Sequence, residues 1–183
     1  LQGHPTNHDN LPGINISSGS LGQGLSVGIG IGLSKKLNQD KSLVFVLTGD
    51  GELQEGQNWE ALMFGAAQKV DNIIVTVDYN GQQIDGSTKD VLDIGDLDKK
   101  LESFGWEVLK IENGNSLNEV FEFISSAKEK TKFMRPNLIL NLVERSLDGA
   151  VSSDAKSNQD SIKWGKRAMG TEFEHVIVKK IRI

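Results

Sequence analysis

The segment that decides the fold begins with Gly49-Asp50-Gly51-Glu52-Leu53-Gln54-Glu55-Gly56 and ends with Asp78-Tyr79-Asn80-Gly81. The first motif follows the apolar run 43–48, and the second follows the apolar run 73–77. Apolar runs of this length, bounded by glycine-containing turns, are typical of buried strands. The sequence therefore predicts a strand, an acidic glycine turn, a helix, a second strand and an Asn-Gly turn.

Two polar residues, Asp50 and Asn80, each stand just past the end of a predicted strand. If the two strands are parallel neighbours, both side chains reach the carboxyl edge of the sheet, where open α/β sheets bind ligands. An Asp oxygen, an Asn oxygen and a backbone carbonyl form an all-oxygen ligand set that suits Mg²⁺, with Ca²⁺ as the alternative. We therefore expect a diphosphate carried on a divalent cation at this edge.

Several motifs give the chain a resemblance to the thiamine-diphosphate-binding domain of transketolases, especially the form in which two subunits share the enzyme. They are Gly3-His4-Pro5, Leu11-Pro12-Gly13, Ser18-Gly19-Ser20-Leu21-Gly22-Gln23-Gly24, the 49–56 motif, Trp59-Glu60-Ala61, the 78–81 motif and Ile84-Asp85-Gly86. The likeness covers roughly residues 3 to 143. It implies that the chain starts in the middle of the family's domain and lacks an upstream segment.

The resemblance also implies roles for individual residues. Cofactor contacts fall on Gly19, Ser20 and Leu21, on Gly49, Asp50 and Gly51, and on Glu55 and Asn80, with the Gly51 N–H directed toward the diphosphate. The metal ligands are Asp50, Asn80 and the backbone carbonyl of Gln82. His4 of the Gly-His-Pro motif lies beside the reacting substrate in the family and is the catalytic candidate.

The pair Glu55 and Glu60 has two interpretations. Acidic residues in the first turn of a helix interact favourably with the helix dipole and need no other explanation. In transketolase-like enzymes the matching pair meets its symmetry mate across a subunit interface and links two cofactor sites. Both interpretations stay open at this point.

Strand and helix patterns alternate along the rest of the chain. Helices are expected over Leu21–Leu37, with an apolar residue every fourth position, over Gln57–Val70, with Trp59, Leu62, Met63, Ala66, Ala67 and Val70 buried, over Asp96–Phe104, and after the capping pair Ser116 and Glu119; strands are expected over 106–111 and 138–143. Such alternation predicts an α/β fold with a parallel sheet covered by helices on both faces.

The amino-acid composition limits which classes of protein and binding partner remain possible. The chain has 183 residues, a net charge of −5 and no cysteine, which excludes disulfides and thiolate metal sites. The chain has no basic cluster that would suggest binding to nucleic acid, and it has no apolar run long enough to suggest a membrane span. We expect a cytoplasmic protein with one domain over residues 1–170, followed by a tail of unclear structure over 171–183.

Two other site types are disfavoured. His4 and His8 have the helical spacing of a zinc pair, but Pro5 argues against a helix there and no third ligand is evident. Gly49-Asp50-Gly51 does not complete a nicotinamide-type Gly-x-Gly-x-x-Gly motif, because Glu52, Leu53 and Gln54 follow.

The transketolase resemblance implies transfer of a two-carbon ketol unit between sugars by a homo- or hetero-oligomer. A partner domain or subunit that binds the aminopyrimidine of the cofactor must supply the activating glutamate, so we expect this chain to be inactive alone. The family's histidine-containing element is missing from residues 145–167, where Trp164-Gly165-Lys166 stands instead. The alternatives are a component of a thiamine-dependent enzyme for 2-oxo acids and a degenerate subunit that keeps the fold without turnover.

Overall fold

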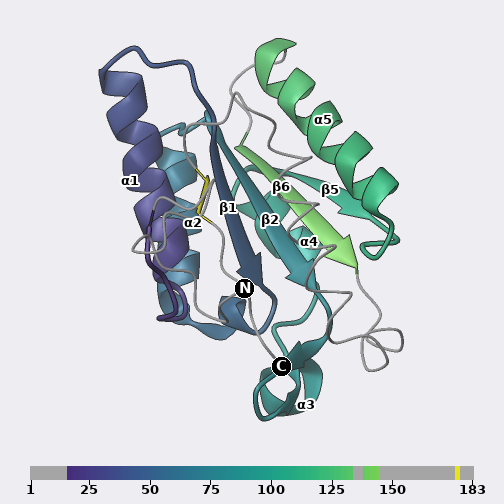
Figure 1. The fold of residues 1–183 in the computed structure, drawn as a ribbon. Helices are drawn as coiled ribbons and strands as arrows, with labels where there is room; N and C mark the ends of the chain where they lie inside the picture. Colours follow the sequence, from purple (N-terminus) through teal and green to yellow (C-terminus); the bar gives the residue numbers. More distant parts are fainter. Residues whose placement is uncertain (1–15, 134–137, 145–175, 178–183) are drawn as a thin grey trace.

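The computed structural model describes residues 16–133, 138–144 and 176–177, with side chains described as far as residue 126. Its centre is a five-stranded sheet with the order β5-β6-β2-β1-β7, in which every neighbouring pair is parallel. The strands are β1 (Val44–Gly49), β2 (Ile73–Tyr79), β5 (Trp106–Ile111), β6 (Leu138–Glu144) and β7 (Val176–Ile177). The predicted parallel α/β fold is therefore confirmed (Figure 1).

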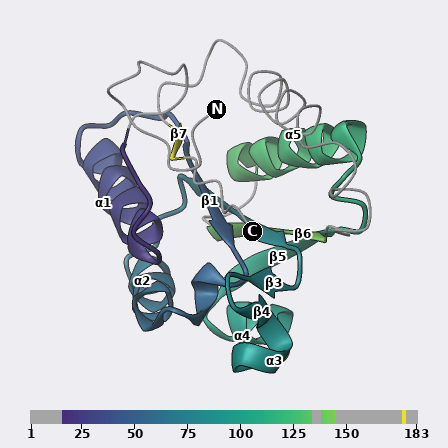
Figure 2. The same cartoon turned by 60° about the horizontal axis from the view of Figure 1, so that its bottom comes forward.

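Helices cover both faces of the sheet. They are α1 (Gln23–Leu37), α2 (Gly56–Ala67), α3 (Thr88–Leu92), α4 (Leu97–Ser103) and α5 (Leu117–Phe133), with a short 3₁₀ helix over Glu52–Gln54. Figure 2 shows α5 on one side of the sheet and α4 on the other. None of the helices within the described ranges is long and apolar enough to cross a membrane.

The main core lies between the sheet and the layer that contains α1, α2 and α4. Alternate residues of β1 and β2 point into this core, while Phe45 and Ile74 point to the opposite face. Helices and strands both contribute residues to this core, among them Leu25, Ile29, Val44, Val46, Leu62, Ile73, Val75, Leu101 and Trp106. Both faces of β1 and β2 are buried, which explains why these strands read as continuous apolar runs.

The apolar stripe expected on the first helix holds only at its centre. Leu25 and Ile29 are buried, but Leu21 and Leu37 are 41% and 84% exposed. A strict four-residue spacing drifts around a helix of 3.6 residues per turn, so the two ends of the series rotate away from the sheet. Gly32 of this helix packs closely against its surroundings, because an added Cβ would lie 2.7 Å from Val70 Cγ1.

The stripe expected on α2 was partly wrong. Met63 is 56% exposed and Ala67 is also exposed, whereas Ala61, Leu62 and Gly65 are buried. Packing against both α1 and the sheet centres the buried face on these last three positions, so Met63 falls on the outer flank. Val70 is buried as expected, although it follows the helix.

The connection after β2 contains elements that the sequence did not predict. The Asn-Gly turn leads into a small antiparallel pair, β3 (Gln82–Gln83) and β4 (Gly86–Ser87), and then into α3. The tail residues Val176 and Ile177 also form a strand, because they pair with Phe45 and Val46 of β1. Part of segment 171–183 therefore belongs to the sheet, while the predicted domain boundary at residue 170 stays a prediction.

Candidate functional site

The two polar turns of the predicted site lie side by side at the carboxyl edge of the sheet. β1 and β2 are parallel neighbours, and Gly49 at the end of β1 pairs with Asp78 near the end of β2. Asp50 and Asn80 follow directly, so the chain delivers them to the same edge. The backbone N–H of Gly81 donates to Asp50 Oδ2 at 2.8 Å, which joins the two turns.

Asp50 is fully buried, and its carboxylate accepts three hydrogen bonds. Besides Gly81, the backbone N–H of Gly51 donates to Oδ1 at 2.9 Å and the Thr88 hydroxyl donates to Oδ2 at 3.3 Å. An ionised carboxylate can accept about four hydrogen bonds or ligand contacts. Three are used here, so one acceptor position remains for a cation.

Burial raises the pKa of Asp50 above its ordinary value of 3.8. The hydrogen bonds from Gly81 and Gly51 lower it, and the negative charge of Asp78 raises it again. The folded protein therefore disfavours the charged form of Asp50 as long as no positive charge lies nearby. A divalent cation would remove this penalty, as in other sites built from buried carboxylates.

Asn80 is oriented by its neighbours on both sides of the amide. Its Nδ2 donates to Asp78 Oδ2 at 3.2 Å, and its Oδ1 accepts from the backbone N–H of Gln82 at 2.9 Å. The amide oxygen keeps one further lone pair. Asp78 thus fixes which end of the amide can act as a ligand.

The third expected ligand, the carbonyl oxygen of Gln82, lies beside the Asp50 turn. A Cβ built on Gly51 would stand 3.2 Å from this oxygen and 2.6 Å from Gln83 Cβ. Only glycine permits this approach of the two turns. The three expected donors, a carboxylate, an amide oxygen and a carbonyl oxygen, are of the types that suit Mg²⁺, and the turns that carry them lie side by side at one edge of the sheet.

This donor set contains only one carboxylate among its proposed ligands. Within the described ranges, no group of three His, Cys, Asp or Glu side chains could hold a metal ion. A cation at Asp50 would thus keep open positions for ligands from outside the chain, such as phosphate oxygens. The Gly51 N–H, which the resemblance directs toward a diphosphate, donates here to Asp50 instead.

The segment containing Gly19, Ser20 and Leu21 leads directly into α1. Ser20 Oγ accepts from Gln23 Nε2 at 3.1 Å, and Gly22 has a left-handed conformation with φ of 81°. The Gly22 N–H donates to Glu52 Oε1 at 2.7 Å, so this segment is tied to the acidic turn that carries Asp50. This contact therefore links the predicted cofactor-contacting segment 19–21 to the turn that carries Asp50, which is itself joined to the Asn80 turn.

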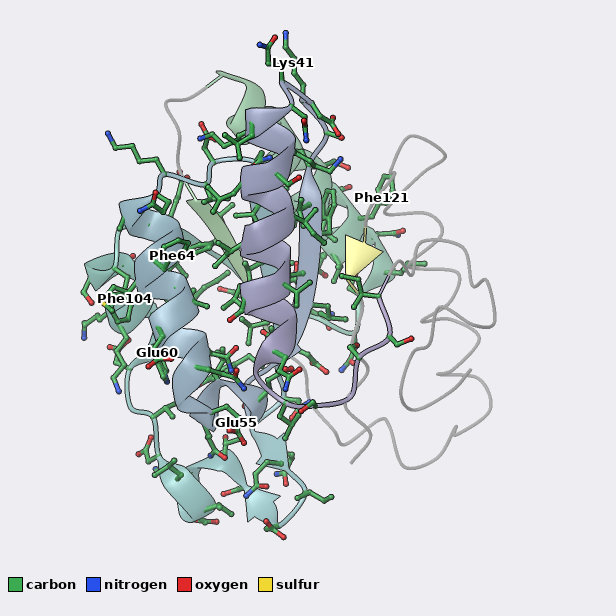
Figure 3. All side chains as sticks on the ribbon, turned by 90° about the vertical axis from the view of Figure 1, so that its left-hand side faces the viewer. Lys41, Glu55, Glu60, Phe64, Phe104 and Phe121 are labelled. Atoms are coloured by element: carbon green, nitrogen blue, oxygen red, sulfur yellow. The ribbon has the colours of Figure 1, made fainter. Side chains whose placement is uncertain are left out.

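Glu55 and Glu60 both lie on the exposed side of the molecule. Glu55 is the N-cap residue of α2, and its side chain makes no capping hydrogen bond. Glu60 lines a groove between α1 and α2 together with Ser26, Ile29, Gly30, Ala61 and Phe64. Figure 3 shows Glu55 near the beginning of α2, with Glu60 and Phe64 farther along that helix. Their exposure leaves the subunit-interface interpretation open, whereas the first-turn interpretation does not hold as stated, because the first turn of α2 contains no acidic residue.

The structure adds residues that the sequence did not single out as part of the site. Glu52 is buried and accepts from the Gly22 N–H, Thr88 is buried and donates to Asp50, and Asp78 orients Asn80. Gln54 Nε2 donates to the carbonyl oxygens of Thr88 and Leu92, which holds α3 against the acidic turn. An acidic residue within a turn of apolar and glycine neighbours was the sequence signal that could have identified Glu52. The sequence held no such signal for Thr88, because its position depends on the β3–β4 pair, which the sequence did not predict. His4, His8 and the divergent region 145–167 lie outside the described residues.

A parallel sheet with buried acceptors and close glycine contacts at its carboxyl edge defines an α/β domain of the kind that binds ligands at its strand ends. Residues 1–163 match the family model described as "Transketolase, thiamine diphosphate binding domain". The chain therefore belongs to the transketolase family and represents its thiamine-diphosphate-binding domain.

Relatives of known name agree with this membership. An apulose-4-phosphate transketolase subunit from Actinobacillus succinogenes is 43% identical over 132 residues, which cover 72% of this chain and 47% of the relative. The 6-deoxy-6-sulfo-D-fructose transketolase subunit SqwG from Clostridium sp. (strain MSTE9) is 35% identical over 152 residues, covering 82% of this chain and 54% of the relative. The chain thus spans about half the length of these relatives.

Solved structures show the same fold. The transketolase from Pichia stipitis in complex with sedoheptulose 7-phosphate superimposes with a TM-score of 0.67 and 28% identity. The match covers 77% of this chain and 22% of that one. The expected fold and family are both confirmed.

Proposed function

We propose that this chain is the thiamine-diphosphate-binding part of a transketolase and holds the cofactor's diphosphate through Mg²⁺. Asp50, Asn80 and the Gln82 carbonyl would ligate the cation, and the segment Gly19–Leu21 together with the Gly49–Gly51 turn and Glu55 would contact the cofactor. The observation that carries the proposal is the 2.8 Å hydrogen bond from Gly81 N–H to Asp50, which brings the two ligand-bearing turns together.

Bound thiamine diphosphate supplies the carbon nucleophile with which a two-carbon ketol unit is transferred between sugars. The contribution of this chain is position and charge. Asp50 and Asn80 would fix the cation, and the buried environment around Asp50 would keep water away from the diphosphate end. His4 is the residue that we propose to lie beside the reacting substrate.

The active protein would be an assembly with a second domain or subunit. Two relatives are named as single subunits of a transketolase, and each match spans only about half of the relative. We propose a partner that binds the pyrimidine end of the cofactor and supplies the activating glutamate. The substrates would be sugars or sugar phosphates, in line with the names of these relatives.

Isothermal titration calorimetry of the protein with its partner, using thiamine diphosphate with and without Mg²⁺, tests the proposal. Saturable binding that requires Mg²⁺ is expected. Equal binding of thiamine diphosphate with and without Mg²⁺ would contradict the assignment of the metal ligands. No binding in the complete assembly would favour a degenerate subunit, which the altered sequence at 145–167 also suggests.

A further inference from the structure

A single peptide group, the one between Leu21 and Gly22, is held from both ends by side chains of the acidic turn and α2. Its N–H donates to Glu52 Oε1 at 2.7 Å. Its C=O accepts from Gln57 Nε2 at 3.1 Å. The acceptor is a carboxylate and the donor is an amide, so the polarity of this pair selects one orientation of the peptide plane.

Glu52 is placed rigidly enough to act as a fixed acceptor. Its side chain is buried, with 1% of the residue exposed, and its Oε2 lies 3.4 Å from the backbone N–H of Gly49. Its backbone carbonyl accepts from Asn58 Nδ2 at 2.6 Å. Burying a carboxylate is costly unless hydrogen bonds compensate for the lost water. A hydrophobic side chain of similar size would avoid that cost, so the acceptor function itself accounts for a glutamate here.

The conformation of Gly22 makes the orientation of this peptide matter. Gly22 has φ of 81°, and an added Cβ would lie 2.9 Å from both Glu55 Cβ and Gln57 Cγ. Glycine accepts either orientation of the preceding peptide more readily than other residues do. The local backbone therefore does not choose the orientation by itself, and the contacts of Glu52 and Gln57 supply the choice.

We propose that Glu52 and Gln57 are positioning residues that lock the Leu21–Gly22 peptide and thereby present the segment Gly19–Leu21 to the cofactor. The inference rests on the proposed function, because that segment is a proposed cofactor contact. Neither side chain is assigned a cofactor contact of its own. They act through the backbone, so their loss should weaken binding without changing its requirement for Mg²⁺.

Gln57→Met tests the hydrogen bond donated to the Leu21 carbonyl. Methionine keeps the length of the side chain, and position 57 is only partly buried. We expect about three- to tenfold weaker binding of thiamine diphosphate in the presence of Mg²⁺, the loss that corresponds to one ordinary hydrogen bond. Gln68→Met, the same change at an exposed position at the end of α2, is the control and should bind normally.

Two changes at Glu52 test the acceptor side. Glu52→Gln keeps an oxygen for the Gly22 N–H and should retain most of the affinity, whereas Glu52→Met removes the acceptor and should not. Amide hydrogen exchange of Gly22, followed by NMR without cofactor, reports on the lock directly. Exchange should be at least about tenfold faster in Glu52→Met and Gln57→Met than in the wild type, since each variant loses a hydrogen bond that holds this peptide in place.

The exchange measurement separates this inference from the proposed function. If the wild-type assembly does not bind thiamine diphosphate, the proposed function fails and the positioning role falls with it, whatever the exchange rates show. If the wild type binds but Gln57→Met binds equally well, or if Gly22 exchange is unchanged in that variant, the positioning role is wrong while the proposed function stands. Failure of the Glu52 variants to fold leaves the Gln57 comparison decisive.

Discussion

Asp50 and Gly81 lie thirty-one residues apart, and the Gly81 N–H donates to Asp50 Oδ2 at 2.8 Å. The carboxylate thus joins the ends of two parallel strands. This contact sets the position of the Asn80–Gln82 turn relative to Asp50, so it links the two parts of the proposed cation site.

Removing the Asp50 carboxylate should abolish metal-dependent binding. For Asp50→Ala we expect affinity for Mg²⁺ and thiamine diphosphate to fall by more than about tenfold, since a charged interaction contributes about 1.5–3 kcal/mol. Calorimetry measures the change. Asp85→Asn, an exposed position in the neighbouring β3–β4 turn, is the matched control and should bind like the wild type. Equal affinity in Asp50→Ala and Asp85→Asn would refute the assignment.

Binding should weaken when the pH is lowered. The pKa of Asp50 is raised by burial, so its proton competes with Mg²⁺ at a higher pH than for an ordinary carboxyl with a pKa of 3.8. We expect the dissociation constant measured by calorimetry to rise as the pH falls toward the raised pKa. In Asn80→Ala, which keeps Asp50, the same trend should persist from a weaker starting affinity.

The pH dependence of stability in the metal-free protein should have the opposite sign. A folded pKa above the unfolded value means that the folded state binds more protons between the two pKa values. Asp50 therefore costs stability as the pH rises from 3.8 through its folded pKa. The free energy of unfolding of the wild type minus that of Asp50→Asn should decrease over this window, as measured by urea denaturation at several pH values. A difference that increases with pH would show that the burial argument is wrong.

Gly51→Ala should separate the two turns. The new Cβ would stand 2.6 Å from Gln83 Cβ, so the β3–β4 pair must move. Overpacking of this kind costs about 1–3 kcal/mol of unfolding free energy, and cofactor affinity should fall with it. Gly56→Ala serves as the control, because nothing lies within 4 Å of a Cβ at that position. Chemical denaturation that finds the two variants equally stable would contradict the close approach of the turns.

Two glycines of α1 should respond to alanine in opposite directions. At Gly32 the added Cβ meets Val70 Cγ1 at 2.7 Å, whereas at Gly30 it meets nothing within 4 Å. Gly30→Ala should raise the free energy of unfolding by about 0.4–1 kcal/mol, and Gly32→Ala should lower it by about 1–3 kcal/mol. Thermal and urea denaturation of the two variants give the comparison. If Gly32→Ala stabilises the protein as much as Gly30→Ala, the proposed packing of α1 on the β2 connection is wrong.

The sequence predicted the order and type of the long elements because their signals are local. The apolar runs predicted β1, β2, β5 and β6, and the Ser116 cap is seen as a contact from the Glu119 N–H to Ser116 Oγ at 3.4 Å. Exposure was harder to predict, as Met63 shows, because it depends on which neighbours cover a helix. Such neighbours are set by tertiary packing rather than by spacing.

The site could be predicted only in part for the same reason. Strand ends identify Asp50 and Asn80, since parallel strands deliver them to one edge. The contact from Thr88 to Asp50 requires the β3–β4 pair to fold back, and two-residue strands leave almost no pattern in a sequence. The turn around Glu52 was a signal in the sequence, but its burial was not predicted, because carboxylates are usually exposed and this one is buried.

Anomalous diffraction from crystals of the complete assembly, grown with Mn²⁺ in place of Mg²⁺ and with thiamine diphosphate, tests the central claim most directly. The account predicts one manganese peak within ligand distance of an Asp50 carboxylate oxygen, Asn80 Oδ1 and the Gln82 carbonyl oxygen, bridged to the diphosphate. A diphosphate-bound manganese peak away from Asp50 and Asn80, or bound thiamine diphosphate with no manganese between these residues, would contradict it.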